Sequence, residues 1–145
     1  MGNKRIVMAL FVLALIGIGL STYSLLHNQG FASGVFCTIG EKLNCDVVNK
    51  GPYSVMLGVP VALIGVIGYL FLVAAAGLKL KNPTDKSLTK FLTLSSIGGF
   101  LFALYLSGIE AFILETWCLV CLTSQVTIFA IMILSLLLLH KENRL

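Results

Sequence analysis

Charge is scarce in this sequence. Of its 145 residues only 11% are Asp, Glu, Lys or Arg, and only 6 are acidic. This shortage excludes a water-soluble domain, whose surface needs far more polar side chains. Apolar residues, by contrast, are abundant: they make up 58% of the chain, and the mean hydropathy is +1.01. Such a composition is typical of an integral membrane protein.

Four apolar runs are each long enough to cross a bilayer, whose hydrocarbon core of roughly 30 Å takes about 20 helical residues at about 1.5 Å each. Only Glu110 places a charge within any of them. Lipid offers the backbone no hydrogen-bond partners, so these spans must be helices. The predicted fold class is an all-α membrane protein, a single bundle of four transmembrane helices with no second domain. The predicted spans are residues 6–26, 55–78, 91–114 and 117–139.

The basic residues are divided unequally between the two sides of this bundle. Eight of the ten flank the spans on the side of the chain termini, and only Lys42 and Lys50 lie on the other side. Since Lys and Arg accumulate on the cytoplasmic side, both termini are expected to be cytoplasmic. The net charge of +4 therefore reflects topology in membrane lipid and predicts no nucleic-acid surface. A cleaved signal peptide is the alternative for the first span, but the span is long and no small-x-small site follows it.

The four cysteines form two pairs that this orientation places outside the cytoplasm. Cys37 and Cys45 lie in the extracytoplasmic loop after the first span, and Cys118 and Cys121 lie where the fourth span begins. In an oxidising compartment disulfides persist, and an even count predicts two of them, with three possible connectivities. Zinc is a competing use of four thiols. The seven residues within the first pair fit a zinc knuckle poorly, so no metal site is expected.

The spacing Cys118-x-x-Cys121 favours a redox function over a structural one. A disulfide across so short a loop would stabilise the fold little, whereas the positive end of a helix dipole favours the reactive thiolate. We therefore expect both cysteine pairs to be catalytic. Electrons would enter at Cys37 and Cys45 from a partner protein, pass to the second pair by exchange, and leave to a lipid-soluble acceptor. Two structural disulfides in a four-span scaffold are the alternative.

Polar residues near the second pair suggest a site for that acceptor. Gln125 shares a helix face with Cys118 and Cys121. Its amide would hydrogen-bond either a quinone carbonyl or a neighbouring helix. Glu110 would either accept a proton when quinol forms or extend to the membrane interface.

Small residues recur every three or four positions along the second span, from Ser54 to Gly65. This stripe would either admit a flat ring or let helices pack closely, and a similar stripe in the third span is expected to serve packing alone. Pro60 is expected to kink the second helix. The predicted contacts of a quinone, either ubiquinone or menaquinone, are Ser54, Gly58, Ala62 and Gln125.

Two stretches resemble the vitamin K epoxide reductase family, in particular its prokaryotic members. They are "FCTIGEKLNCDVVNKGPYSVMLGVPVALIG", from residue 36, and "WCLVCLTS", from residue 117. The resemblance implies a four-helix bundle around a quinone. It also implies that Cys37 and Cys45 are a shuttle pair, that Cys118 exchanges with them, and that Cys121 meets the quinone.

Three positions bear on the substrate that the resemblance implies. Gly51 stands where members often have serine, and Gln125 stands where the animal enzymes have tyrosine. Ser54 falls where the animal enzymes place an asparagine that contacts the ring. These differences concern epoxide chemistry more than disulfide chemistry.

The expected function is that of a membrane thiol–disulfide oxidoreductase in disulfide bond formation. It would reoxidise a thioredoxin-fold protein, soluble or membrane-anchored, and pass two electrons to a quinone. Many prokaryotic members continue into a thioredoxin-like domain. This chain is expected to lack one, so its redox partner is expected to be a separate polypeptide. The alternative within the family is a reductase of vitamin K or its epoxide in an endoplasmic reticulum.

Overall fold

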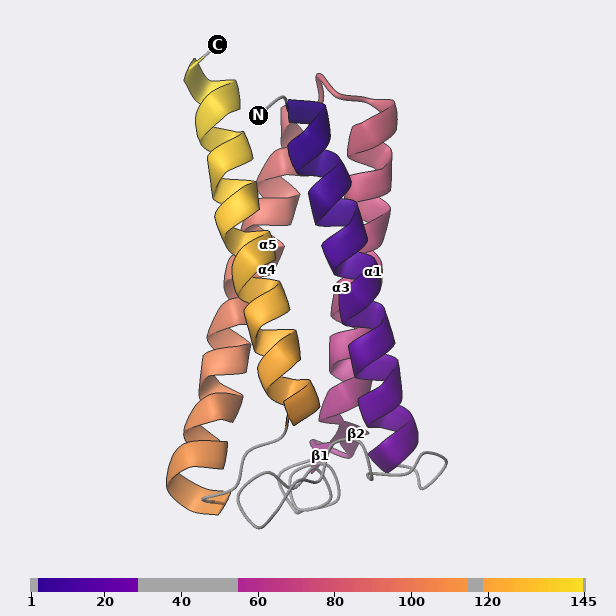
Figure 1. Ribbon diagram of the computed structural model, residues 1–145, viewed down its shortest axis with the longest axis vertical. Helices are drawn as coiled ribbons and strands as arrows, with labels where there is room; N and C mark the ends of the chain where they lie inside the picture. The colour runs from indigo at the N-terminus through magenta and orange to yellow at the C-terminus, as the bar shows by residue number, and fades with distance from the viewer. Residues whose placement is uncertain (1–2, 29–54, 115–118, 145) are drawn as a thin grey trace.

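Four long helices form a bundle in the computed structural model, which describes residues 3–28, 55–114 and 119–144 (Figure 1). They are α1 (Asn3–Asn28), α3 (Val61–Lys81), α4 (Lys86–Ile109) and α5 (Leu119–Arg144). Each is long and apolar enough to cross a membrane, so the expected all-α four-helix fold is confirmed. The start of α1 and the end of α5 lie at one end of the bundle, which we call the termini end. The opposite end is the Cys121 end, since Cys121 lies in the first turn of α5.

A short hairpin precedes the second membrane helix, where the sequence predicted helix. Strands β1 (Val55–Met56) and β2 (Val59–Pro60) pair antiparallel. The two turn residues, Leu57 and Gly58, have φ of 54° and 82°, the positive values that a two-residue turn of type I′ requires. Pro60 is the N-cap residue of α3, where its missing N–H costs no helical hydrogen bond. The predicted kink at Pro60 is therefore wrong, and Gly58 belongs to a turn and not to a helical stripe.

The helices α4 and α5 extend beyond the predicted spans. α4 starts at Lys86 because the Asp85 side chain caps it, accepting a hydrogen bond from the Ser87 N–H at 2.9 Å. At its other end the chain continues as a π-helical turn, η2 (Glu110–Leu114). α5 runs on to Arg144, since Lys, Glu and Arg are good helix formers. A charged residue ends an apolar run in the sequence, but it does not end the helix.

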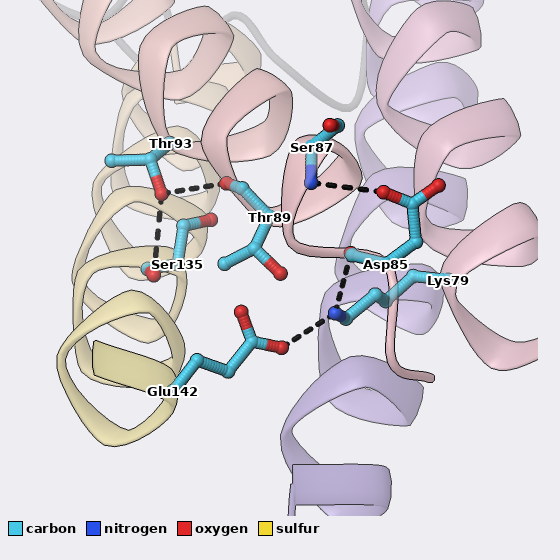
Figure 2. Close-up of polar contacts among 7 residues, drawn as sticks. All are labelled: Lys79, Asp85, Ser87, Thr89, Thr93, Ser135 and Glu142. Carbon is cyan, nitrogen blue, oxygen red and sulfur yellow. Dashed lines mark hydrogen bonds and ion pairs between the residues drawn. The ribbon is translucent and has the colours of Figure 1, made fainter. Parts of the chain in front are cut away.

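A buried ion pair joins three segments at the termini end (Figure 2). The Lys79 side chain of α3 is 1% exposed, and its Nζ lies 2.5 Å from Oε1 of Glu142 on α5. The same Nζ donates to the backbone oxygen of Asp85 at 2.7 Å. Beside this pair, Thr93 Oγ1 of α4 lies 3.3 Å from the carbonyl oxygen of Ser135 on α5. Lys79, which lies just beyond the predicted span 55–78, is thus part of the core.

Glycines let the helices pack closely in the middle of the bundle. A Cβ atom on Gly17 of α1 would overlap the Tyr69 ring of α3, and one on Gly65 of α3 would lie 2.9 Å from a serine oxygen of α1. A Cβ atom on Gly99 of α4 would lie 3.2 Å from the Ile128 side chain of α5. Gly65 of the second span and Gly99 of the third span therefore serve close helix packing, as expected for the third span.

Candidate functional site

A cavity of about 560 Å³ lies within the bundle, and residues of all four membrane helices line it. Most of its wall is apolar, with aromatic rings from α3 and α4. Its polar side chains toward the Cys121 end are Ser21 and Ser24 of α1, Glu110 of η2, and Cys121, Ser124 and Gln125 of α5. An apolar cavity with a few convergent polar groups is typical of a small-molecule site.

Cys121 lines this cavity from the first turn of α5 and is half-buried. Since α5 begins at Leu119, the thiol lies near the positive end of the helix dipole, where negative charge on sulfur is stabilised. Ala62 of α3 and Gln125 of α5 line the same cavity. The structure therefore brings together three of the residues that the sequence singled out.

Gln125 lies one turn further along α5, about 6 Å from Cys121 by helical rise. Its Oε1 accepts a hydrogen bond from Ser107 Oγ of α4 at 2.6 Å. The sequence left open whether this amide bonds a neighbouring helix or a ligand. The oxygen bonds the helix, and the side chain still forms part of the cavity wall.

Tyr69 is a cavity residue that the sequence analysis missed. Its hydroxyl on α3 lies 3.0 Å from both the carbonyl oxygen and Oγ of Ser124 on α5. Its ring packs on Gly17, where a Cβ atom would overlap it. A tyrosine in the middle of an apolar span is the signal that was available, because its hydroxyl needs a hydrogen-bond partner there.

Glu110 is 2% exposed and lines the cavity from η2. A carboxyl that extends to the membrane interface would be accessible at the edge of the bundle. The burial of Glu110 contradicts this alternative.

The cavity reaches the outer surface of the bundle between α3 and α4. Phe71 and Phe91 line it although they are 59% and 43% exposed. At Gly68 and Gly98, which also line it, a Cβ atom would meet open space. α4 leans away from α3 toward the Cys121 end (Figure 1). In a membrane this surface contacts lipid, so a lipid-soluble molecule has a direct route into the cavity.

Among the remaining predicted site residues, the structure describes only Gly58, and it lies away from this cavity. Gly58 is exposed in the hairpin turn and is not among the lining residues. Cys37, Cys45, Ser54 and Cys118 lie outside the described residues. Within residues 3–28, 55–114 and 119–144, no cluster of three His, Cys, Asp or Glu side chains is arranged to hold a metal ion.

Comparison with known proteins identifies the family. The model of the vitamin K epoxide reductase family matches residues 8–136, which include the greater part of each membrane helix. No match was found among curated proteins. The family consists of membrane oxidoreductases that use quinones, in keeping with an apolar cavity that opens toward lipid and has a thiol in its wall. This chain belongs to the vitamin K epoxide reductase family.

Proposed function

We propose that the protein is a membrane thiol–disulfide oxidoreductase that reoxidises a thioredoxin-fold partner and passes the electrons to a quinone. The observation that carries the proposal is the position of Cys121, whose thiol lies in the wall of an apolar cavity together with the Gln125 amide. Family membership supports the coarser activity, that of a membrane oxidoreductase which uses a quinone.

The cavity suits a quinone in size and in chemistry. Its volume of about 560 Å³ falls within the roughly 300–1,000 Å³ of small-molecule sites. Apolar and aromatic walls suit a flat ring with an apolar tail. Because Gln125 Oε1 accepts from Ser107, the amide keeps its NH₂ group for a carbonyl oxygen of the ring. Ala62, Gly65 and Gly68 of α3 line the same cavity, where their small size leaves room for a ring.

Each turnover would move two electrons. The Cys118 and Cys121 thiols form a disulfide and release two electrons and two protons, which convert the quinone to a quinol. The dithiol of Cys37 and Cys45 then reduces that disulfide by exchange. The partner's dithiol in turn reduces the disulfide of Cys37 and Cys45, and the partner leaves oxidised.

The proposed orientation has both termini in the cytoplasm and the Cys121 end outside it. It is supported by the distribution of basic residues, eight toward the termini end against Lys42 and Lys50. The partner is then an extracytoplasmic thioredoxin-fold protein, soluble or membrane-anchored.

Quinone reduction by the purified protein in lipid nanodiscs tests this function. The donor is a reduced thioredoxin-fold oxidant, the acceptor is ubiquinone or menaquinone, and quinone absorbance is followed. Cys121→Ala is expected to lower turnover by about 10³-fold or more, as loss of a nucleophile does. Thr123→Ala, an exposed position on the same helix, is the matched control and should keep the wild-type rate. If Cys121→Ala also keeps it, the cysteine is only structural.

The same preparation distinguishes the animal-type activity. Vitamin K epoxide is offered as the substrate, with a small dithiol as the electron donor. Gln125 stands where the animal enzymes have tyrosine, so we expect quinone to be reduced and the epoxide to remain. Turnover of the epoxide at the quinone rate would favour the alternative.

A further inference from the structure

Glu110 is the one charged residue within the four predicted spans, and it is 2% exposed. It lines the cavity together with Cys121 and Gln125. On α4 the lining residues Ala103 and Leu106 precede it at helical spacing, so Glu110 continues the row of side chains that faces the cavity.

The backbone at Glu110 departs from a regular α-helix. Residues Glu110–Leu114 form a π-helical turn, and the Glu110 N–H donates to the carbonyl oxygens of both Leu106 and Ser107. Such turns occur frequently at functional sites. An ionisable side chain within a membrane span is costly, and in membrane proteins such residues commonly mark proton or ion pathways. Burial in the cavity and the π-helical turn are independent observations on the same residue.

The described part of the chain places few other titratable groups in this cavity. Among the described residues that line the cavity, they are Tyr69 of α3 and Cys121 of α5, while α1 contributes none. The other buried carboxylate in this part of the chain is Glu142, which pairs with Lys79 at the termini end. Of the carboxyl groups that the structure describes, Glu110 is therefore the one that shares a cavity with the Cys121 thiol.

We propose that Glu110 carries protons between the thiols and the quinone, an inference that rests on the proposed function. Oxidation of the two thiols to a disulfide releases two electrons and two protons, and conversion of a quinone to a quinol consumes the same number. The Glu110 carboxylate accepts the two protons released by the thiols one after the other and delivers each to a quinone oxygen. It ends each turnover in its starting state. The protons released by the thiols therefore equal those consumed by the quinone, and none is needed from water.

Glutamine at this position tests the proposal, because it keeps the shape of the side chain but carries no exchangeable acid proton. In the nanodisc assay, Glu110→Gln is expected to lower kcat by about 10²- to 10⁴-fold, the range of general acid–base catalysis. The KM for quinone and the melting temperature should stay at their wild-type values. Glu110→Asp should keep the wild-type dependence of kcat on pH at a lower rate. Glu142→Gln removes the other buried carboxylate and should keep the wild-type pH profile.

An unchanged kcat and pH profile in Glu110→Gln would overturn the proposal. A raised KM with unchanged kcat would do so as well, because it would make Glu110 a binding group. If the Gln variant unfolds, the Asp variant decides: a lowered kcat with the wild-type pH profile supports the proton carrier, and an unchanged kcat overturns it. Failure of the proposed function is seen separately, as quinone reduction that is missing in the wild type or that persists in Cys121→Ala.

Discussion

Ser107 Oγ on α4 lies 2.6 Å from Gln125 Oε1 on α5, and this hydrogen bond orients the amide in the cavity wall. Because the amide oxygen accepts from the hydroxyl, the NH₂ group is the part of the amide that donates elsewhere. Contact with a neighbouring helix and contact with a ligand are therefore compatible, since different atoms of Gln125 serve each. Ser107 acts on a ligand only through Gln125, as a positioning residue.

Ser107→Ala is expected to raise the KM for quinone by about fivefold, the loss of about one hydrogen bond of 1 kcal/mol. The amide would then be free to rotate away from its donating orientation. Gln125→Leu should raise KM at least as much, and the double variant should add little, because both changes act through one amide. The measurement is quinone reduction over a range of quinone concentrations. Additive effects of the two substitutions would contradict this coupling.

Gly98→Leu is expected to fill part of the opening between α3 and α4, since a Cβ atom at Gly98 meets open space and the residue lines the cavity. Reduction of a long-tailed quinone should slow by about tenfold, equivalent to about 1.4 kcal/mol. A short-tailed analogue should be less affected. Gly108→Leu is the control, because Gly108 also has open space but does not line the cavity. Equal effects of the two substitutions would show that the opening has no role.

Tyr69→Phe removes the hydroxyl that lies 3.0 Å from two oxygens of Ser124. We expect the free energy of unfolding to fall by about 1 kcal/mol. Tyr105→Phe is the matched control, since Tyr105 is 55% exposed on the same bundle, and its loss should change stability little. Thermal unfolding of the two variants in detergent makes the comparison. A larger loss at Tyr105 would mean that the Tyr69 bond contributes nothing.

Lys79→Met leaves the Glu142 carboxylate buried without its ammonium partner. Breaking a buried pair in this way typically costs about 3–5 kcal/mol, whereas replacing both members by apolar residues is often neutral. The double variant Lys79→Met/Glu142→Leu should therefore recover much of the stability that the single variant loses. Lys81→Met, at an exposed position, is the control. Unfolding by a denaturing detergent measures all four proteins, and a double variant as unstable as the single one would contradict the role of the pair.

Hydropathy was sufficient to predict the four helices, because a span in lipid must satisfy its backbone within itself. It was insufficient at their ends. Residues Val55–Met56 and Val59–Pro60 are as apolar as the helix that follows, so the hairpin is indistinguishable from helix by hydropathy alone. α5 passes through Lys141 and Glu142 because helix propensity, and not hydropathy, governs its last turns.

The site was predictable where it depends on one helix. Cys121 and Gln125 lie one helical turn apart, so their common cavity follows from periodicity. The pairs Tyr69–Ser124 and Lys79–Glu142 are separated by 55 and 63 residues, and which side chains meet across helices depends on how each helix is rotated. Rotation also decides whether Glu110 faces lipid or the cavity, which is why the sequence left two alternatives for it.

The opening between α3 and α4 determines whether a ligand enters the cavity from the lipid or from water. A molecule that comes through lipid is present at a concentration set by its partition coefficient between water and bilayer. Two inhibitors with equal affinity for the cavity would then differ in apparent potency by the ratio of their partition coefficients. Changing the amount of lipid at constant total inhibitor would shift the apparent potency of both.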